Sequence, residues 1–112
     1  MKKQFIPFTD FMKLDIRVGE VKTAVQAEGS NKLILLTVDL GEDYGVVEIF
    51  TGMAKFHTLD EFIGKKFLFI ANLEPRPMMG KTSNGMIISA DVDEKPVLLP
   101  ADQSIPNGAS IS

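Results

Sequence analysis

Three short segments contain residue types that could perform chemistry, and each lacks a part that the chemistry requires. Gly80-Lys81-Thr82 matches the end of a phosphate-binding loop, but the first glycine of that motif would fall at Pro75. His57 is the single histidine, and no serine or cysteine stands at a spacing that suggests a nucleophile. The segment Asp91-Val92-Asp93-Glu94 lacks the glycine and the terminal-glutamate spacing of a calcium loop. The sequence therefore predicts a protein that is not an enzyme, with no metal and no cofactor.

The composition is that of one globular domain. The chain has 112 residues, of which 45% are hydrophobic and 24% charged, a balance that argues against disorder and coiled coil. The absence of cysteine excludes disulfides and thiolate catalysis. No apolar run approaches the ~20 residues of a membrane span. The basic start, residues 1–7, is not followed by the apolar core of a signal peptide, because Pro7, Thr9 and Asp10 interrupt it. We expect a cytoplasmic protein that does not bind membranes.

The charge distribution leaves room for an anionic partner. The net charge is −3, and residues 91–112 account for it, because four acidic residues there face Lys95 alone. Within residues 62–82 the balance reverses, and Glu74 faces four basic residues: Lys65, Lys66, Arg76 and Lys81. A neutral body with a basic patch can bind phosphates, with an affinity that falls steeply as salt rises.

The elements that must position these residues are mostly strands. Five segments rich in β-branched and aromatic residues are bounded by turn residues: Ile16–Val25 with a kink at Gly19, Lys32–Leu40, Val46–Thr51, Lys66–Leu73 and Gly85–Asp91. Thr58 as N-cap and Gly64 as the end predict one short helix between the third and fourth strands. Residues 74–84, with two prolines, are expected to form a long loop. Further short strands are expected at Pro96–Leu99 and after the turn at residues 106–108.

This element order predicts an all-β fold, the five-stranded Greek-key OB-fold barrel, with a C-terminal extension. Such barrels bind ligands across a strand face and the loops between strands 1 and 2 and strands 4 and 5. An SH3-like barrel or a small sandwich would explain the strands equally but the helix less well. Four phenylalanines fall at positions that the barrel must fill and are expected in the core: Phe50, Phe62, Phe67 and Phe69.

Several separated blocks resemble the tRNA-binding domain family, whose members are appended to methionyl-tRNA synthetases, occur in synthetase-associated factors or stand alone as dimers. The opening block is Phe11–Gly19, and Asn31-Lys32-Leu33 looks like the second strand of the family. The strongest block, residues 71–86, resembles the signature Asn-Leu-x-Pro-Arg…Gly-x-x-Ser-x-Gly-Met almost throughout. Residues 25–30 depart from the family, which usually has a His-Pro-acidic stretch in this loop.

The resemblance implies a non-catalytic protein that recognises tRNA by its shape and phosphate backbone and assists an aminoacyl-tRNA synthetase. It also implies one domain over residues 1–112 and a homodimer, with residues 92–112 as the dimerisation segment. Eight residues are expected to contact RNA: Arg17, Lys32, Asn72, Arg76, Met79, Lys81, Ser83 and Met86.

Most of these residues also have a plain structural interpretation. Arg17 could hold a phosphate through two hydrogen bonds, or could pair with Asp15 or Asp39. Lys32 could be a solvated lysine at the start of a strand. Asn72 and Ser83 could bond to sugar, phosphate or bases, or satisfy the backbone of their own turns.

Two other functions remain open at this stage. Proteins of the CsaA type share the resemblance and are described as export chaperones that bind unfolded polypeptide in a dimer cavity. The adaptable side chains of Met78 and Met79 would suit that role. The third possibility is an assembly module that has kept the fold and lost RNA affinity. A salt titration of tRNA binding against duplex DNA and an unfolded polypeptide separates the three.

Overall fold

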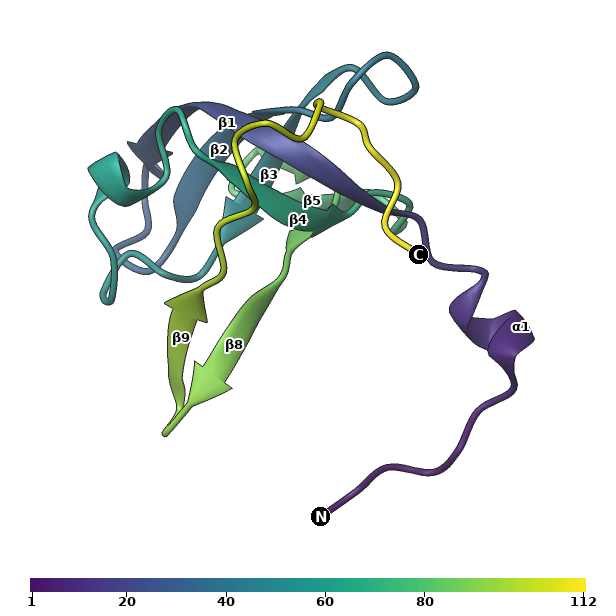
Figure 1. The fold of residues 1–112 in the computed structure, drawn as a ribbon. Helices are drawn as coiled ribbons and strands as arrows, with labels where there is room; N and C mark the ends of the chain where they lie inside the picture. Colours follow the sequence, from purple (N-terminus) through teal and green to yellow (C-terminus); the bar gives the residue numbers. More distant parts are fainter.

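A curled antiparallel sheet of five strands forms the body of the molecule (Figure 1). In this computed structural model, which describes residues 1–112, the strand order is β3-β2-β1-β4-β7. The strands are β1 (Ile16–Gln26), β2 (Ile34–Asp39), β3 (Val46–Thr51), β4 (Lys66–Ile70) and β7 (Met86–Ile87). The expected all-β class is therefore confirmed, with β1 in the middle of the sheet.

Strand β1 is long and pairs with a different strand along each of its two edges. Its second half pairs with β2, and its first half pairs with β4 on the other edge. The register shifts between Val21 and Thr23, so the irregularity expected at Gly19 lies instead at Lys22. Gly19 is needed for close packing, because a Cβ there would lie 2.7 Å from Cγ1 of Val38 and 2.8 Å from Cδ2 of Leu40.

The core fills the inside of the curl. Phe62, Phe67 and Phe69 are fully buried and Phe50 is 8% exposed, so the phenylalanines expected in the core are found there. The alternation of buried and partly exposed residues along β4 places Phe67 and Phe69 on the inner face. Burying side chains of this size stabilises the fold by about 1.5–3 kcal/mol each.

The segment between β3 and β4 contains a 3-10 turn, η1 (Leu59–Glu61), in place of a longer helix. The backbone N–H of Thr58 donates to Oε2 of Glu61 at 2.7 Å, and Gly64 ends the segment with a φ of +78°. Phe62 follows the turn with helical backbone angles (φ −102°, ψ −41°), its N–H donates to the carbonyl of Leu59 at 3.0 Å, and its side chain is fully buried. A second short helix, α1 (Phe8–Phe11), precedes β1 and was not expected from the sequence.

The region after β4 differs from the expected loop. Residues 74–84 contain a hairpin of β5 (Arg76–Met78) and β6 (Lys81–Ser83), joined by Met79 and Gly80. Both turn residues have positive φ, +50° and +79°, as a two-residue turn that matches the twist of a hairpin requires. Pro77 is tolerated because β5 pairs on one edge only.

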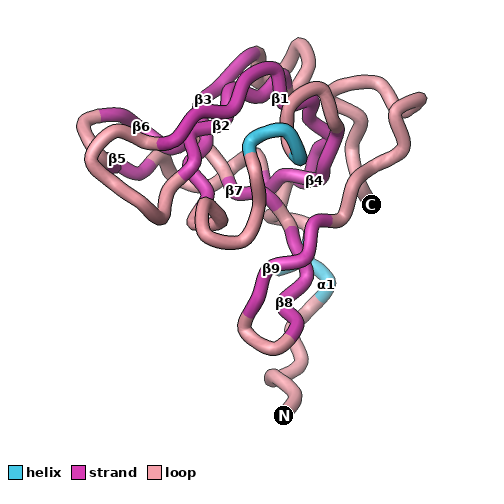
Figure 2. The backbone as a smooth tube through the Cα atoms, turned by 90° about the vertical axis from the view of Figure 1, so that its left-hand side faces the viewer, coloured by secondary structure: helices cyan, strands magenta, loops and turns pink.

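The expected fifth strand is broken in two. After β7 the chain turns out of the main sheet at Ile88, and β8 (Ser89–Val92) pairs with β9 (Lys95–Leu98) in a separate hairpin. Figure 2 shows this hairpin extending away from the body. Residues 86–90 contain no glycine, proline or charged residue that would have indicated the break.

Residues 105–112 return to the body. The N–H of Val18 donates to the carbonyl of Ala109 at 3.0 Å, and the N–H of Gly108 donates to the carbonyl of Val18 at 2.7 Å. Arg17 and Ser110 form an isolated antiparallel bridge. The C-terminal segment therefore occupies the edge of β1 that β2 leaves unpaired. In addition, the structure has no helix whose length and apolar character would let it cross a membrane.

Candidate nucleic-acid interface

A groove opens between the β5–β6 hairpin and the main sheet. Its volume is about 210 Å³. Its apolar lining comes from five side chains: Leu33, Phe50, Leu73, Met78 and Met86. Its polar lining comes from Glu74, Arg76 and Ser83, with Gly52 and Gly85 contributing backbone. The groove therefore combines apolar walls with charged groups at one hairpin.

The register of the hairpin places four side chains on one face. Arg76 lies opposite Ser83, and Met78 lies opposite Lys81, so these pairs project to the same side. Arg76 makes no ion pair, whereas Nζ of Lys81 lies 3.5 Å from Oε2 of Glu48. The Lys81 side chain is half exposed, and at this exposure the pair contributes little to stability. Both cations are therefore available to a phosphate.

Hydrogen bonds attach the β5–β6 hairpin to β3 of the main sheet. The backbone N–H of Phe50 donates to Oγ of Ser83 at 3.0 Å, and Ser83 is nearly buried. The backbone N–H of Asn84 donates to the carbonyl of Glu48 at 2.9 Å. Gly85 has no room for a side chain, because a Cβ would lie 2.8 Å from the carbonyl oxygen of Ile70. These contacts hold β6 against β3.

The two methionines of the hairpin reach the loop between β1 and β2. Met78 packs against a small buried cluster of Ala27, Leu35 and Phe50. Met79 is half exposed, and its Cε would lie 3.0 Å from a Cβ built on Gly29. The two loops expected to flank the ligand are therefore in contact.

Lys32 lies in a turn just before β2, two residues earlier than the strand itself begins. Oγ of Ser30 accepts hydrogen bonds from the N–H groups of Lys32 and Leu33, at 3.1 and 3.3 Å. Lys32 is exposed and makes no ion pair, and its neighbour Leu33 lines the groove. The turn therefore holds a free cation beside the groove.

Asn72 is committed to the backbone of another segment. Its Oδ1 accepts from the N–H of Asp15 at 2.8 Å, and its Nδ2 donates to the carbonyl of Lys13 at 2.7 Å. The side chain ties the end of β4 to the start of β1. It does not line the groove.

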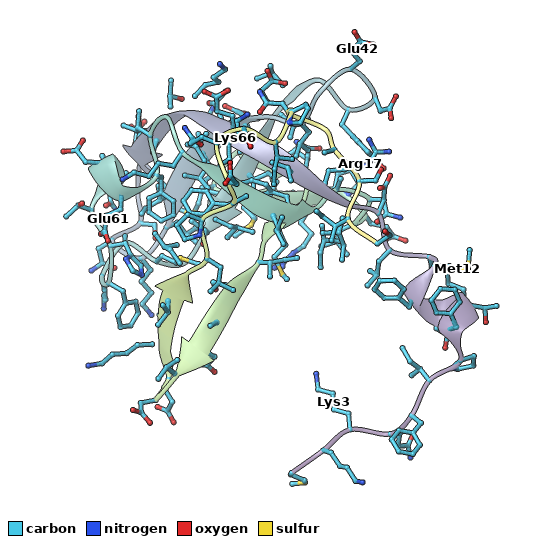
Figure 3. All side chains as sticks on the ribbon, in the orientation of Figure 1. Lys3, Met12, Arg17, Glu42, Glu61 and Lys66 are labelled. Atoms are coloured by element: carbon cyan, nitrogen blue, oxygen red, sulfur yellow. The ribbon has the colours of Figure 1, made fainter.

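Arg17 lies at a different place, near the C-terminal segment and the loop that carries Glu42 (Figure 3). Its guanidinium donates to Asp15 at 2.7 Å, to Asp43 at 2.9 Å and to the carbonyl of Gly108 at 3.1 Å. The pairing with Asp15, one of the two alternatives from the sequence, is present. Asp39 instead accepts from Gly41 and Asn107.

The ion pair is reflected in the titration of these groups. The hydrogen bond from Arg17, followed by the one from Tyr44, holds the pKa of Asp15 below its usual value. The hydrogen bond to Asp15 raises the pKa of Tyr44. The hydrogen bonds to Asp15 and then Asp43 raise the pKa of Arg17. The Arg17 side chain is 15% exposed, so it presents little surface to a ligand.

Of the residues expected to contact RNA, Arg76, Ser83 and Met86 line the groove. Lys81 and Met79 belong to the same hairpin and Lys32 is next to the groove residue Leu33, whereas Arg17 and Asn72 lie elsewhere. Four further residues line the groove and were not predicted as part of the site: Leu33, Phe50, Leu73 and Glu74. Phe50 was expected in the core and is only 8% exposed, and it also forms part of the groove lining. Glu74 lies within the signature block, residues 71–86. Its negative charge, close to the basic residues Arg76 and Lys81, is the sequence feature that could have indicated a role in the site.

A family model described as a putative tRNA binding domain matches residues 16–110, nearly the whole sheet and both hairpins. The chain belongs to the tRNA-binding domain family. A relative among curated proteins is the methionine–tRNA ligase of Methanothrix thermoacetophila, 41% identical over 110 residues, which are 98% of this chain and 16% of the ligase. The chain therefore spans about a sixth of the length of that relative.

Two solved structures of similar proteins have nearly the same size as this member of the tRNA-binding domain family. The MetRS-related protein from Pyrococcus horikoshii has a TM-score of 0.92 at 35% identity, covering 98% of this chain and all of its own. The chaperone CsaA from Bacillus anthracis has a TM-score of 0.85 at 27% identity, covering 97% of this chain and all of its own. Both likenesses concern the complete fold.

Proposed function

We propose that this chain is a non-catalytic tRNA-binding protein that recognises tRNA by its shape and phosphate backbone. The observation that carries the proposal is the groove, where a member of the tRNA-binding domain family presents unpaired cations beside apolar walls. We assign the curled sheet to the OB-fold, with η1 in the position of its helix. In that fold the loops between strands 1 and 2 and strands 4 and 5 bind oligonucleotides.

Each residue around the groove then has a distinct task. Arg76, Lys81 and Lys32 contact phosphates, and the exposed parts of Met79 and Met86 pack on bases or sugars. Ser83 contributes a hydroxyl at the groove. Arg17 and Asn72 act behind the interface, where they hold the chain segments that support it.

Assistance to an aminoacyl-tRNA synthetase follows from the relatives, in which a similar segment forms part of a methionine–tRNA ligase. We propose that a cytoplasmic, free-standing form of this chain raises the local concentration of tRNA near such an enzyme. A homodimer would serve this purpose, because two copies related by a two-fold axis present twice the number of cations to one tRNA.

Within the expected dimerisation segment, residues 92–112, the β8–β9 hairpin is the part that is free to meet a second copy. Val92 and Val97 of this hairpin and Leu99 after it are exposed, each by between 43% and 51%. Residues 105–112 instead bond to β1 of their own chain. We therefore narrow the proposed interface to the hairpin.

A peptide-binding chaperone is the second candidate. It is favoured by the likeness to the CsaA structure and by methionines in the groove, which adapt to varied apolar side chains. A peptide would leave the unpaired cations at the rim without partners, whereas a nucleic acid would use them.

Fluorescence anisotropy with labelled tRNA across a salt titration tests the proposal. We expect binding that weakens with salt and resists an excess of duplex DNA and of an unfolded polypeptide. Binding of the unfolded polypeptide without tRNA binding would instead indicate the chaperone, and no binding of either would leave an assembly module.

Replacement of both hairpin cations, Arg76→Ala with Lys81→Ala, gives the first prediction. We expect tRNA affinity to fall several-fold with no change in the melting temperature, because both side chains are exposed and support no core contact. Lys65→Ala, at an exposed lysine outside both the groove and the β8–β9 hairpin, is the control and should bind nearly as the parent does. Equal losses for the two variants would mean that the charges act only as a diffuse field.

A further inference from the structure

We propose that the groove binds a single unstacked nucleotide of RNA, with the base between the apolar walls, and that Glu74 selects guanine. The inference rests on the proposed function and adds the chemical identity of the nucleotide that the same site takes. Under this proposal the protein recognises one base in addition to the shape and the phosphate backbone of the RNA.

The dimensions of the groove fit a base and little more. Pockets that enclose drug-sized ligands begin at roughly 300 Å³, and this groove measures about 210 Å³. It is also too short to accept an amphipathic helix, which requires anchors over two turns. Its walls include Phe50 and the thioether side chains of Met78 and Met86, and such side chains pack well on the face of a planar ring. A base that has left its stack supplies such a face.

The charges indicate how the nucleotide is oriented. Arg76 lines the groove without an ion pair, so its guanidinium is free to bind a phosphate. Glu74, two residues earlier, also lines the groove and makes no hydrogen bond or ion pair within the chain. A carboxylate repels phosphate, so the part of the groove beside Glu74 must receive the part of the nucleotide that carries N–H donors.

Guanine is the base that satisfies a carboxylate best. Its N1–H and N2–H₂ groups are adjacent and can donate to both oxygens of Glu74 at once. Adenine and cytosine each place an acceptor nitrogen beside their amino group, and uracil has one N–H between two carbonyls. These three bases would set an acceptor against the carboxylate.

Ser83 provides a donor for an acceptor on the same base. Its Oγ accepts the N–H of Phe50 at 3.0 Å and makes no other hydrogen bond, so its own proton has no partner within the chain. Ser83 is 6% exposed and lines the groove. A ligand or a water molecule must therefore accept the hydroxyl proton. An acceptor such as the O6 of guanine would satisfy it.

The walls are held in place before any ligand arrives. Met78 is packed on its buried cluster, and the hairpin is bonded to β3 through Ser83 and Asn84. A site that needs no ordering loses less entropy on binding. This rigidity lets a small groove discriminate between bases.

Two labelled hexaribonucleotides, UUUGUU and UUUUUU, test the selection by anisotropy with the intact chain. We expect UUUGUU to bind at least about fivefold more tightly, a ratio at the low end of that given by a two-bond base contact. Glu74→Gln should abolish the ratio by weakening UUUGUU alone. Arg76→Ala should weaken both RNAs and preserve the ratio. Glu42→Gln, an exposed carboxylate on the far loop (Figure 3), is the matched control and should change nothing.

A second readout locates the contact. With ¹³C-labelled methionine methyl groups, UUUGUU should shift the signals of Met78 and Met86 and leave that of Met1 unchanged. If tRNA binds but the two RNAs bind equally, the selection by Glu74 is wrong and the proposed function stands. If neither tRNA nor either RNA binds, both proposals fail. If an unfolded polypeptide shifts the same methyl signals and tRNA does not, the groove is a peptide site and the inference is overturned.

Discussion

Arg17 is surrounded by acceptors from three separate parts of the chain. Asp15 precedes β1, Asp43 lies between β2 and β3, and Gly108 belongs to the C-terminal segment. The Tyr44 ring also lies 5.3 Å from the guanidinium, within the range of a cation–π contact. This one side chain therefore joins elements that are distant in sequence. The sequence alone shows only that an acidic residue, Asp15, lies two positions from Arg17. For this reason Arg17 could be assigned equally to a phosphate or to a carboxylate.

Arg17→Ala should lower the melting temperature by several degrees and leave tRNA affinity nearly unchanged, because the residue supports the fold away from the groove. The pKa of Asp15 is lowered from 3.8, so the stabilisation by this pair is present above that pH and is lost as the pH falls through the lower native value. The difference in melting temperature between parent and variant should therefore be constant near neutral pH and shrink below about pH 3.8. A clear loss of tRNA affinity at unchanged stability would place Arg17 in the interface after all.

The contribution of His57 to stability depends on pH with the opposite sign. Burial alone would lower its pKa, but the hydrogen bond to the Pro96 carbonyl and the pair with Glu61 outweigh burial, so the pKa is raised above 6.5. The stabilisation is complete below pH 6.5 and is lost as the pH rises through the native pKa. The melting temperature of the parent should therefore fall as the pH rises above 6.5, and that of His57→Gln should fall less. Parallel curves for the two proteins would contradict this.

At the scale of elements, the strands with clear burial patterns were predictable. Val46–Thr51 was predicted at its observed bounds, and Thr58 does begin the short helical turn. The β5–β6 hairpin was not, because Pro77 argues against a strand and Met79-Gly80 lacks the usual Asn-Gly signal. The break between β7 and β8 was also invisible, because no glycine, proline or charged residue stands between Ile87 and Ser89. The groove residues were predictable where the signature names them, but the contribution of Phe50 and Leu33 depends on how the sheet curls.

Met79 occupies a position that suits asparagine or glycine better. Its φ of +50° costs a non-glycine residue roughly 1–2 kcal/mol, so Met79→Asn should stabilise the hairpin by up to about 1 kcal/mol. The same change removes a half-exposed apolar contact beside the groove and should weaken tRNA binding about two- to threefold. Chemical denaturation and anisotropy measure the two effects. Gly80→Ala, at a φ of +79°, is the control that should destabilise.

For the molecule as a whole, the proposed dimer depends on the β8–β9 hairpin, whereas the stability of the fold depends on residues 105–112. Changes in each segment therefore test dimerisation and stability separately. Val97→Asp with Leu99→Asp changes exposed side chains and should yield a stable monomer by sedimentation, with weaker tRNA binding because the second set of cations is lost. Deleting residues 105–112 should instead lower stability, because Ile16 and Val18 lose three backbone hydrogen bonds and Lys66 loses its bond to the Ile105 carbonyl. A truncated chain that sediments as a stable monomer, with the hairpin variant still dimeric, would move the interface from the hairpin to the C-terminal segment.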